Sequence, residues 1–110
     1  MIELIVYKYL KKALSCHVCV ERYKDVETYV YIEKTQGNDK TGLKTCTIAI
    51  QSYGDKLIEV LELNEEVKKA MKDIIKLDEI SSCKLVNDYK FDDVVRKKHR
   101  YQALFDITYY

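Results

Sequence analysis

The chain has 110 residues, 47% of them hydrophobic and 34% charged, which is typical of one folded domain with a single core. Nineteen basic and eighteen acidic residues leave a formal charge of +1, whereas nucleic-acid-binding proteins usually carry a clear basic excess. No apolar run approaches the ~18 residues that a membrane helix needs, and Glu3 stands where a signal peptide would be basic. We therefore expect a single domain over residues 1–110 that stays in the cytoplasm, has no membrane partner and keeps its four cysteines as thiols.

The N-terminal half reads as one helix followed by strands. Apolar residues at helical spacing predict a short helix that ends near Ser15. Alternating patterns then predict strands at Cys16–Glu21 and Thr28–Lys34, joined by a polar connection at Arg22–Glu27. Next, Gln36–Gly42 holds two of the three glycines and no apolar residue, which predicts the long, mobile tip of a hairpin.

A strand and the longest helix of the chain follow. Leu43–Gln51 alternates and is rich in β-branched residues, which predicts the returning strand of the hairpin. At Gly54 the apolar period changes from two to three or four residues, and this predicts an amphipathic helix that reaches Leu77. Ser82–Val86 reads as a further strand, while Asn87–Val95 fits either a loop or an extended arm.

The last predicted strand begins at His99 and alternates strongly over its length. Strands outnumber helices and follow one another through short connections, which favours antiparallel pairing with the helices gathered on one face. The predicted fold class is therefore α+β: a mainly antiparallel sheet of four to five strands, with a short N-terminal helix and one long helix packed on one face.

The stretch most suggestive of a metal or redox site is Cys16-His17-Val18-Cys19. Zinc needs four ligands, however, and there is no second closely spaced pair of cysteines, because Cys46 and Cys83 stand alone. In a strand, Cys16 and Cys19 point to opposite faces and cannot share a metal. We therefore expect no metal and no cofactor, and we interpret the cysteines as small apolar residues.

No group of residues predicts catalysis. The two histidines, His17 and His99, lie neither in a glycine-rich turn nor beside a helix start, the settings that activate a cysteine nucleophile. The carboxylate pairs Asp92-Asp93 and Glu65-Glu66 are adjacent in sequence, so their side chains do not converge. The chain is therefore predicted not to be an enzyme.

Arg96-Lys97-Lys98-His99-Arg100 is the strongest basic run, and Tyr101 follows it. Basic and aromatic residues together bind phosphates and stack on bases, so the run is a candidate nucleic-acid contact. The near-neutral chain equally fits a solvated loop that enters a strand, or charges at the rim of a protein–protein contact. The sequence leaves these three interpretations open.

Polar and tyrosine-rich segments are candidates for contacts with other proteins. Gln36–Gly42 has nothing to bury, and Tyr29 and Tyr31 occupy the less apolar face of their strand. Loops of this kind on a rigid sheet often become ordered only against a partner, although a plain hairpin tip fits the pattern as well.

Five strings of the sequence carry a resemblance to a known family. They are Met1-Ile2-Glu3-Leu4-Ile5-Val6-Tyr7, Tyr29–Thr35, Ile48–Tyr53, Leu63–Met71 and Arg100–Tyr109. In the same order, and over nearly the whole chain, they resemble the tail terminator (tail completion) proteins of long-tailed bacteriophages. The strings are structural patterns rather than chemical motifs, and Cys16–Cys19 is not among them.

The resemblance implies an assembly role in the virion. Proteins of this family form a sixfold ring on the head-proximal end of the finished tail tube, stop its polymerisation and provide the docking surface for the head and neck. The implied partners are further copies of the chain in a hexameric ring, the tail tube protein and a head or neck connector protein. DNA would pass through the ring without sequence-specific binding. The implied location is the virion tail, after assembly in the host cytoplasm.

The resemblance transfers no catalytic or metal-binding residue, but it directs attention to two surfaces. The hypothetical interface with the tube or a neighbouring subunit comprises Gln36, Gly37, Asn38, Asp39, Lys40, Thr41, Gly42, Tyr29 and Tyr31. The hypothetical contact with the neck or a subunit comprises Asp88, Tyr89, Lys90, Phe91, Asp92 and Arg96. The alternatives are a head–tail joining (neck) protein, or a small nucleic-acid-binding domain that uses Arg96–Arg100.

Overall fold

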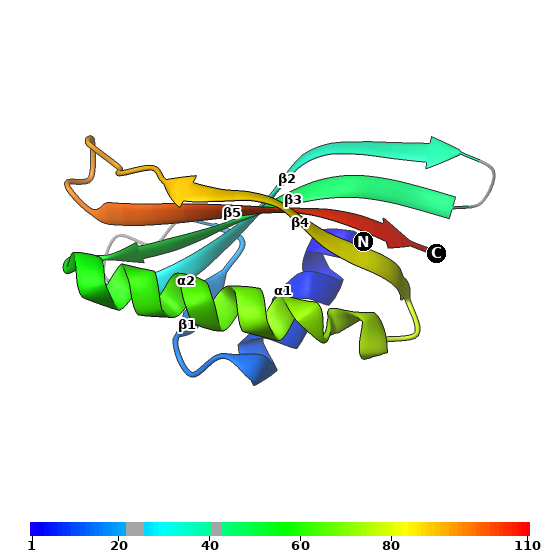
Figure 1. Ribbon diagram of the computed structural model, residues 1–110, viewed down its shortest axis with the longest axis horizontal. Coiled ribbons are helices and arrows are strands. Elements are labelled where there is room, and N and C mark those ends of the chain that lie inside the picture. Colours follow the sequence, from blue (N-terminus) through cyan, green and yellow to red (C-terminus); the bar gives the residue numbers. More distant parts are fainter. Residues whose placement is uncertain (22–25, 41–42) are drawn as a thin grey trace.

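Two helices lie on one face of a five-stranded sheet in a computed structural model of the chain, which describes residues 1–21, 26–40 and 43–110 (Figure 1). In chain order the elements are α1 (Ile2–Ala13), β1 (His17–Cys19), β2 (Tyr29–Lys40), β3 (Leu43–Gly54), α2 (Leu57–Lys72), the short 3-10 helix η1 (Ile74–Lys76), β4 (Ile80–Lys90) and β5 (His99–Tyr109). The strand order across the sheet is β1-β2-β3-β5-β4. The predicted α+β class is confirmed.

The sheet is mixed rather than purely antiparallel. The pairs β2–β3, β3–β5 and β4–β5 are antiparallel, but β1 runs parallel to β2, with His17 opposite Tyr29 and Cys19 opposite Tyr31. β1 has only three residues, and so short a strand has too little pattern to predict the direction of its pairing. Part of the predicted connection at Arg22–Glu27, residues 22–25, lies outside the described residues.

Period-two alternation decides which face of the sheet meets the helices. Ile48 and Ile50 of β3 are fully buried on that face, and Ile48 lies opposite the buried Phe105 of β5. Val6 of α1 and Met71 of α2 close the same core at the predicted helical spacing. Burial of each large apolar side chain is worth roughly 1.5–3 kcal/mol, so this single core holds the helices against the sheet.

The hairpin formed by β2 and β3 is longer than the sequence predicts. The prediction of a loop at Gln36–Gly42 is wrong as far as Lys40, because Gln36, Asn38 and Lys40 continue the ladder opposite Thr47, Thr45 and Leu43. Thr41 and Gly42 lie outside the described residues. Backbone hydrogen bonds form the ladder whatever the side chains are. Because this end of the strand has polar residues on both faces, its sequence does not show the apolar–polar alternation from which a strand is predicted. In Figure 1 this end of the hairpin extends toward the right, away from the helices.

Two further boundaries differ from the predictions. The long helix begins at Leu57 and ends at Lys72, and the chain then turns through η1 instead of continuing as α-helix to Leu77. β4 extends through Lys90, so the ambiguous segment at residues 87–95 is strand in its first part. Residues 91–98, which we call the β4–β5 turn, then lead into β5 through a bridge between Asp93 and Lys98.

Candidate functional site

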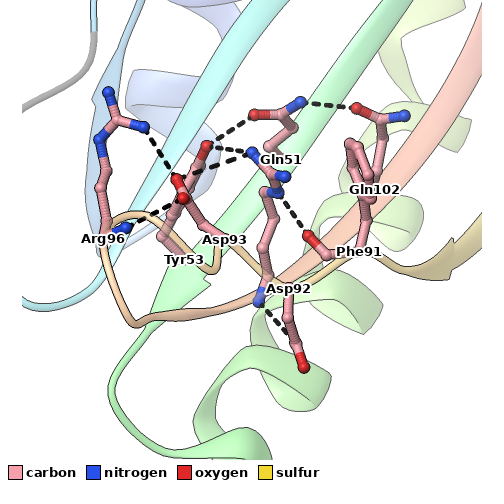
Figure 2. Close-up of polar contacts among 8 residues, drawn as sticks. Gln51, Tyr53, Phe91, Asp92, Asp93, Arg96 and Gln102 are labelled. Atoms are coloured by element: carbon pink, nitrogen blue, oxygen red, sulfur yellow. Dashed lines mark hydrogen bonds and ion pairs between the residues drawn. The ribbon is translucent and has the colours of Figure 1, made fainter.

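The β4–β5 turn is fastened to the sheet face opposite the helices, which we call the helix-free face (Figure 2). Asp93 is only 5% exposed and accepts hydrogen bonds from the backbone N–H of Arg96 at 3.1 Å and from its guanidinium at 2.9 Å. The guanidinium of Arg100 lies 3.8 Å from the same carboxylate. On the other side of the turn, the Lys98 ammonium donates to the Glu27 carbonyl at 2.9 Å and to the Asp55 carboxylate at 3.0 Å.

From Arg100 a chain of hydrogen bonds crosses the helix-free face. Arg100 donates to the Tyr53 hydroxyl at 2.8 Å, and that hydroxyl donates to the side-chain oxygen of Gln51 at 2.9 Å. The Gln51 amide donates to Gln102 at 2.6 Å, and the Gln102 amide donates to the Tyr89 hydroxyl at 2.5 Å. Figure 2 shows that Gln51, Tyr53 and Gln102 come from the central strands, so the network connects β3, β5, β4 and the turn.

Electrostatics strengthen this fastening. Burial alone would raise the pKa of the Asp93 carboxyl, but the hydrogen bonds from Arg96 and the charges of Arg96 and Arg100 together hold that pKa below its ordinary value. The Arg100 guanidinium also stacks on the Phe91 ring, 4.1 Å from its centroid. The network contains a charged pair and neutral hydrogen-bonding groups but no free base beside a nucleophile, so the arrangement favours holding a shape rather than doing chemistry.

The fastened turn displays apolar side chains to solvent. Val94 and Val95 stand at its tip with 83% and 89% of their surface exposed. Leu85, Val86 and Phe91, on and just after β4, are also exposed large apolar residues. We call these five residues the β4-side patch. Exposed apolar side chains gathered along one strand and the turn that follows it are typical of a contact with another macromolecule.

The predicted neck or subunit contact falls on the same side of the molecule as this patch. Tyr89 and Phe91 are exposed there, with their rings 6.0 Å apart. Asp88 instead pairs with Lys68 of α2 at 2.6 Å, and Arg96 binds Asp93. Lys90 and Asp92 are exposed and lie 3.5 Å apart. The predicted contact overlaps the β4–β5 turn but does not include its most exposed side chains, those of Val94 and Val95.

The predicted tube or subunit interface lies mainly at the other end of the sheet. Gln36, Gly37 and Asn38 are exposed on the protruding end of the hairpin. For Asp39 and Lys40 only the backbone is described, and Thr41 and Gly42 lie outside the description.

The two tyrosines of that predicted interface differ in exposure. Tyr31 is half-buried, whereas Tyr29 is 0% exposed and stacks on Tyr53 at 4.6 Å between ring centroids. Tyr29 is therefore part of the structure that supports the surface, not of the surface itself.

The basic run at residues 96–100 is largely engaged inside the molecule. Arg96 and Arg100 form ion pairs with the Asp93 carboxylate. Lys98 donates hydrogen bonds to the Asp55 carboxylate and to the backbone carbonyl of Glu27. Lys97 is exposed and has a φ of 55°, a conformation that a tight turn requires. A phosphate-binding stripe needs several cations that face outward together, and the engaged side chains do not provide one.

All four cysteines are free thiols. Cys16 packs against the core beneath the sheet, whereas Cys19 belongs to the cluster of Tyr29 and Tyr53 on the helix-free face. Burial raises the pKa of the Cys16, Cys46 and Cys83 thiols to about 11. Among residues 1–21, 26–40 and 43–110, no group of three or more His, Cys, Asp or Glu side chains could hold a metal ion.

Two hollows are formed by the described residues near the candidate surfaces. One, of about 590 Å³, lies between α2 and β4, where Met71, Cys83, Leu85 and Phe105 form its apolar floor. The other, of about 500 Å³, lies at the base of the protruding hairpin, where Thr47 donates to the Asp106 carboxylate at 2.7 Å. Neither hollow contains a nucleophile paired with a base.

Comparisons with known proteins give no assignment. The sequence matches no model of a protein family, and no curated protein matches it significantly. Within the described part of the chain, no helix is both long enough and apolar enough to cross a membrane.

Proposed function

We propose that the chain is a structural subunit of a phage tail, of the tail terminator type, which ends tube growth and presents a surface to the head and neck. The proposal rests on the resemblance carried by its strings and on one geometric observation. Two exposed elements, the β2–β3 hairpin end and the β4–β5 turn, project from opposite ends of one sheet in a molecule 43 Å long (Figure 1).

Two projecting elements at opposite ends suit a protein that must contact two different neighbours. In the proposed role one end docks on the tail tube and the other meets the neck. The end that meets the neck does not imitate a tube subunit, so no further tube subunit adds. The hairpin end is assigned to the tube because its exposed side chains are polar and its ladder holds it extended. The part of the β4-side patch in the β4–β5 turn, Phe91, Val94 and Val95, is assigned to the neck.

Shortening the hairpin tests the assignment of the tube contact. Gly37 lies directly opposite Cys46, so residues 38–45 can be replaced by Asn-Gly, which closes a two-residue hairpin turn at that pair. We expect this variant to keep its fold by circular dichroism and to lose capping of purified tail tubes, measured by electron microscopy and by tube length after further tube protein is added. Glu62→Ala, on the exposed side of α2, is the matched control and should cap normally.

The complete role is tested by removing the protein from an infection. Tails assembled without it should be of irregular length and should fail to join heads. Normal tails that join heads in its absence would contradict the proposal. Tails of normal length that cannot join heads would instead favour the head–tail joining alternative.

A further inference from the structure

We propose that the outer edge of β4 in one copy of this chain pairs antiparallel with the outer edge of β2 in a second copy, so that neighbouring sheets continue into one another. The inference rests on the proposed function in taking a second copy as the partner. Beyond the proposed function, the inference specifies which strands of the two copies pair, in which direction they run and in which register.

Both outer edges are open among the described residues. β4 pairs only with β5, and β2 beyond Tyr31 pairs only with β3. Eight of the eleven residues of β4 are exposed, all except Ile80, Cys83 and Asp88, and β2 is exposed from residue 33 to residue 38. Long open edges carry unpaired backbone N–H and C=O groups and are templates for pairing with another chain.

The direction of the pairing follows from the topology. Each neighbouring pair in the series β2, β3, β5, β4 is antiparallel, so β4 runs opposite to β2. Rotation of a copy about an axis along the strands keeps these directions, and β4 of one copy then meets β2 of the next as an antiparallel neighbour. A contact between two different edges is head-to-tail, and its repetition gives a ring where the rotation between copies closes and an open filament where it does not.

Three features restrict the register. β1 occupies the edge of β2 up to Tyr31, so a new strand can begin only at Ile32. β2 has a register irregularity between Lys34 and Gln36. β4 has irregularities between Ile80 and Ser82 and between Leu85 and Asn87, which divide its edge into regular stretches at residues 82–85 and 87–90. The open edge of β2 is therefore regular at residues 32–34 and 36–40. We choose residues 32–34 and 82–85 for the pairing because their side chains match.

If Glu33 lies opposite Lys84 of the neighbouring copy, opposite charges meet on one face of the joined sheet and apolar side chains meet on the other. Glu33 pairs with Ala49 and Lys84 with Asp106, positions on the helix-free face, so the two opposite charges would meet there. The same register places Ile32 opposite Leu85, and both belong to the helix-covered face. Leu85, 42% exposed in the single chain, would be covered by this contact. A β4–β4 contact centred on Lys84 would instead place two lysines opposite each other.

Disulfide trapping tests the pairing and its head-to-tail character. In a Cys83→Ser background, Glu33→Cys and Lys84→Cys are made in separate chains. Directly opposed residues of an antiparallel ladder have Cα atoms about 4.5–5.5 Å apart, which a disulfide can span. Under mild oxidation, we expect a covalent dimer when the two variants are mixed and none from either variant alone. Glu33→Cys mixed with Glu62→Cys is the control and should give no dimer.

The trapping is done both in concentrated solution and on tail tubes. A Lys84→Cys dimer formed without the other variant would overturn the inference in favour of a β4–β4 contact. Absence of the mixed dimer in both settings would also overturn the proposed β4–β2 pairing. If the wild-type protein still caps tubes in that case, the proposed function would stand without this pairing. A mixed dimer from a protein that does not cap tubes would support the pairing and contradict the proposed function.

Discussion

The guanidinium of Arg100 donates a hydrogen bond of 2.8 Å to the hydroxyl oxygen of Tyr53 and lies 5.4 Å from the centroid of the same ring. This contact joins the start of β5 to the end of β3, two segments that lie 47 residues apart in the chain. Because Arg100 is also bound to the β4–β5 turn through Asp93, one side chain connects the exposed tip to the centre of the sheet.

Removal of this side chain should loosen the turn and destabilise the fold. Arg100 is only 9% exposed, so Arg100→Met leaves the buried Asp93 carboxylate and the Tyr53 hydroxyl with fewer partners. We expect a loss of about 2–4 kcal/mol in the free energy of unfolding, measured by urea titration. Lys69→Met, on the exposed side of α2, should change it by less than about 0.5 kcal/mol. Equal effects would show that the network contributes little.

The depressed pKa of Asp93 predicts how stability depends on pH. Its folded-state pKa lies below the unfolded value of about 3.9, so the folded state holds the proton less tightly. The stabilisation is therefore fully present above that value and is lost as pH falls through the folded-state pKa. We expect the free energy of unfolding of Asp93→Asn to fall less steeply than that of the wild type between about pH 4 and pH 2. The exposed Asp78→Asn serves as the control, and a slope as flat for this control would contradict the assignment.

The elements that the sequence predicted well are those in which burial produces a period. Ile48 and Ile50 alternate because one face of β3 meets the helices, and the stripe of α2 recurs because it meets the sheet. Residues 36–38 of β2 lack such a period, since all three are exposed whichever face of the sheet they belong to. The sequence consequently predicts a loop at residues 36–40, although their backbones form a regular ladder with β3.

The network around Asp93 could be predicted only in fragments. Gln51, Arg100 and Gln102 are polar residues inside otherwise apolar strands, and that was the available signal. Their partners depend on the strand order, in which β5 lies between β3 and β4, and a single sequence does not give this order. The ion pairs of Arg96 and Arg100 with Asp93 also could not be predicted from the basic run. The sequence of the run is the same whether these side chains face solvent or a buried carboxylate.

The cysteines provide a test that does not depend on function. Burial raises the pKa of Cys16, Cys46 and Cys83 to about 11, so these thiols are protonated at neutral pH and are poor nucleophiles. We expect native protein to react with a thiol-specific reagent at least about tenfold more slowly than protein unfolded in urea, and the native rate to rise steadily as pH increases toward 11. Mass spectrometry identifies the labelled residue. Fast labelling of Cys16 at neutral pH would contradict the packed arrangement.

The tip valines should matter for docking and not for folding. Val94 and Val95 bury almost nothing in the single chain, so Val94→Ser with Val95→Ser should change the free energy of unfolding by less than about 0.5 kcal/mol. If they anchor the neck contact, the same change should remove apolar surface from the interface and lower the yield of joined particles when variant-capped tails are mixed with filled heads. Ile58→Ser removes an apolar side chain of α2 that is 60% exposed and lies outside the β4-side patch, and it should leave joining intact. Normal joining by the double variant, or an equal loss with Ile58→Ser, would refute the assignment of the patch to the neck.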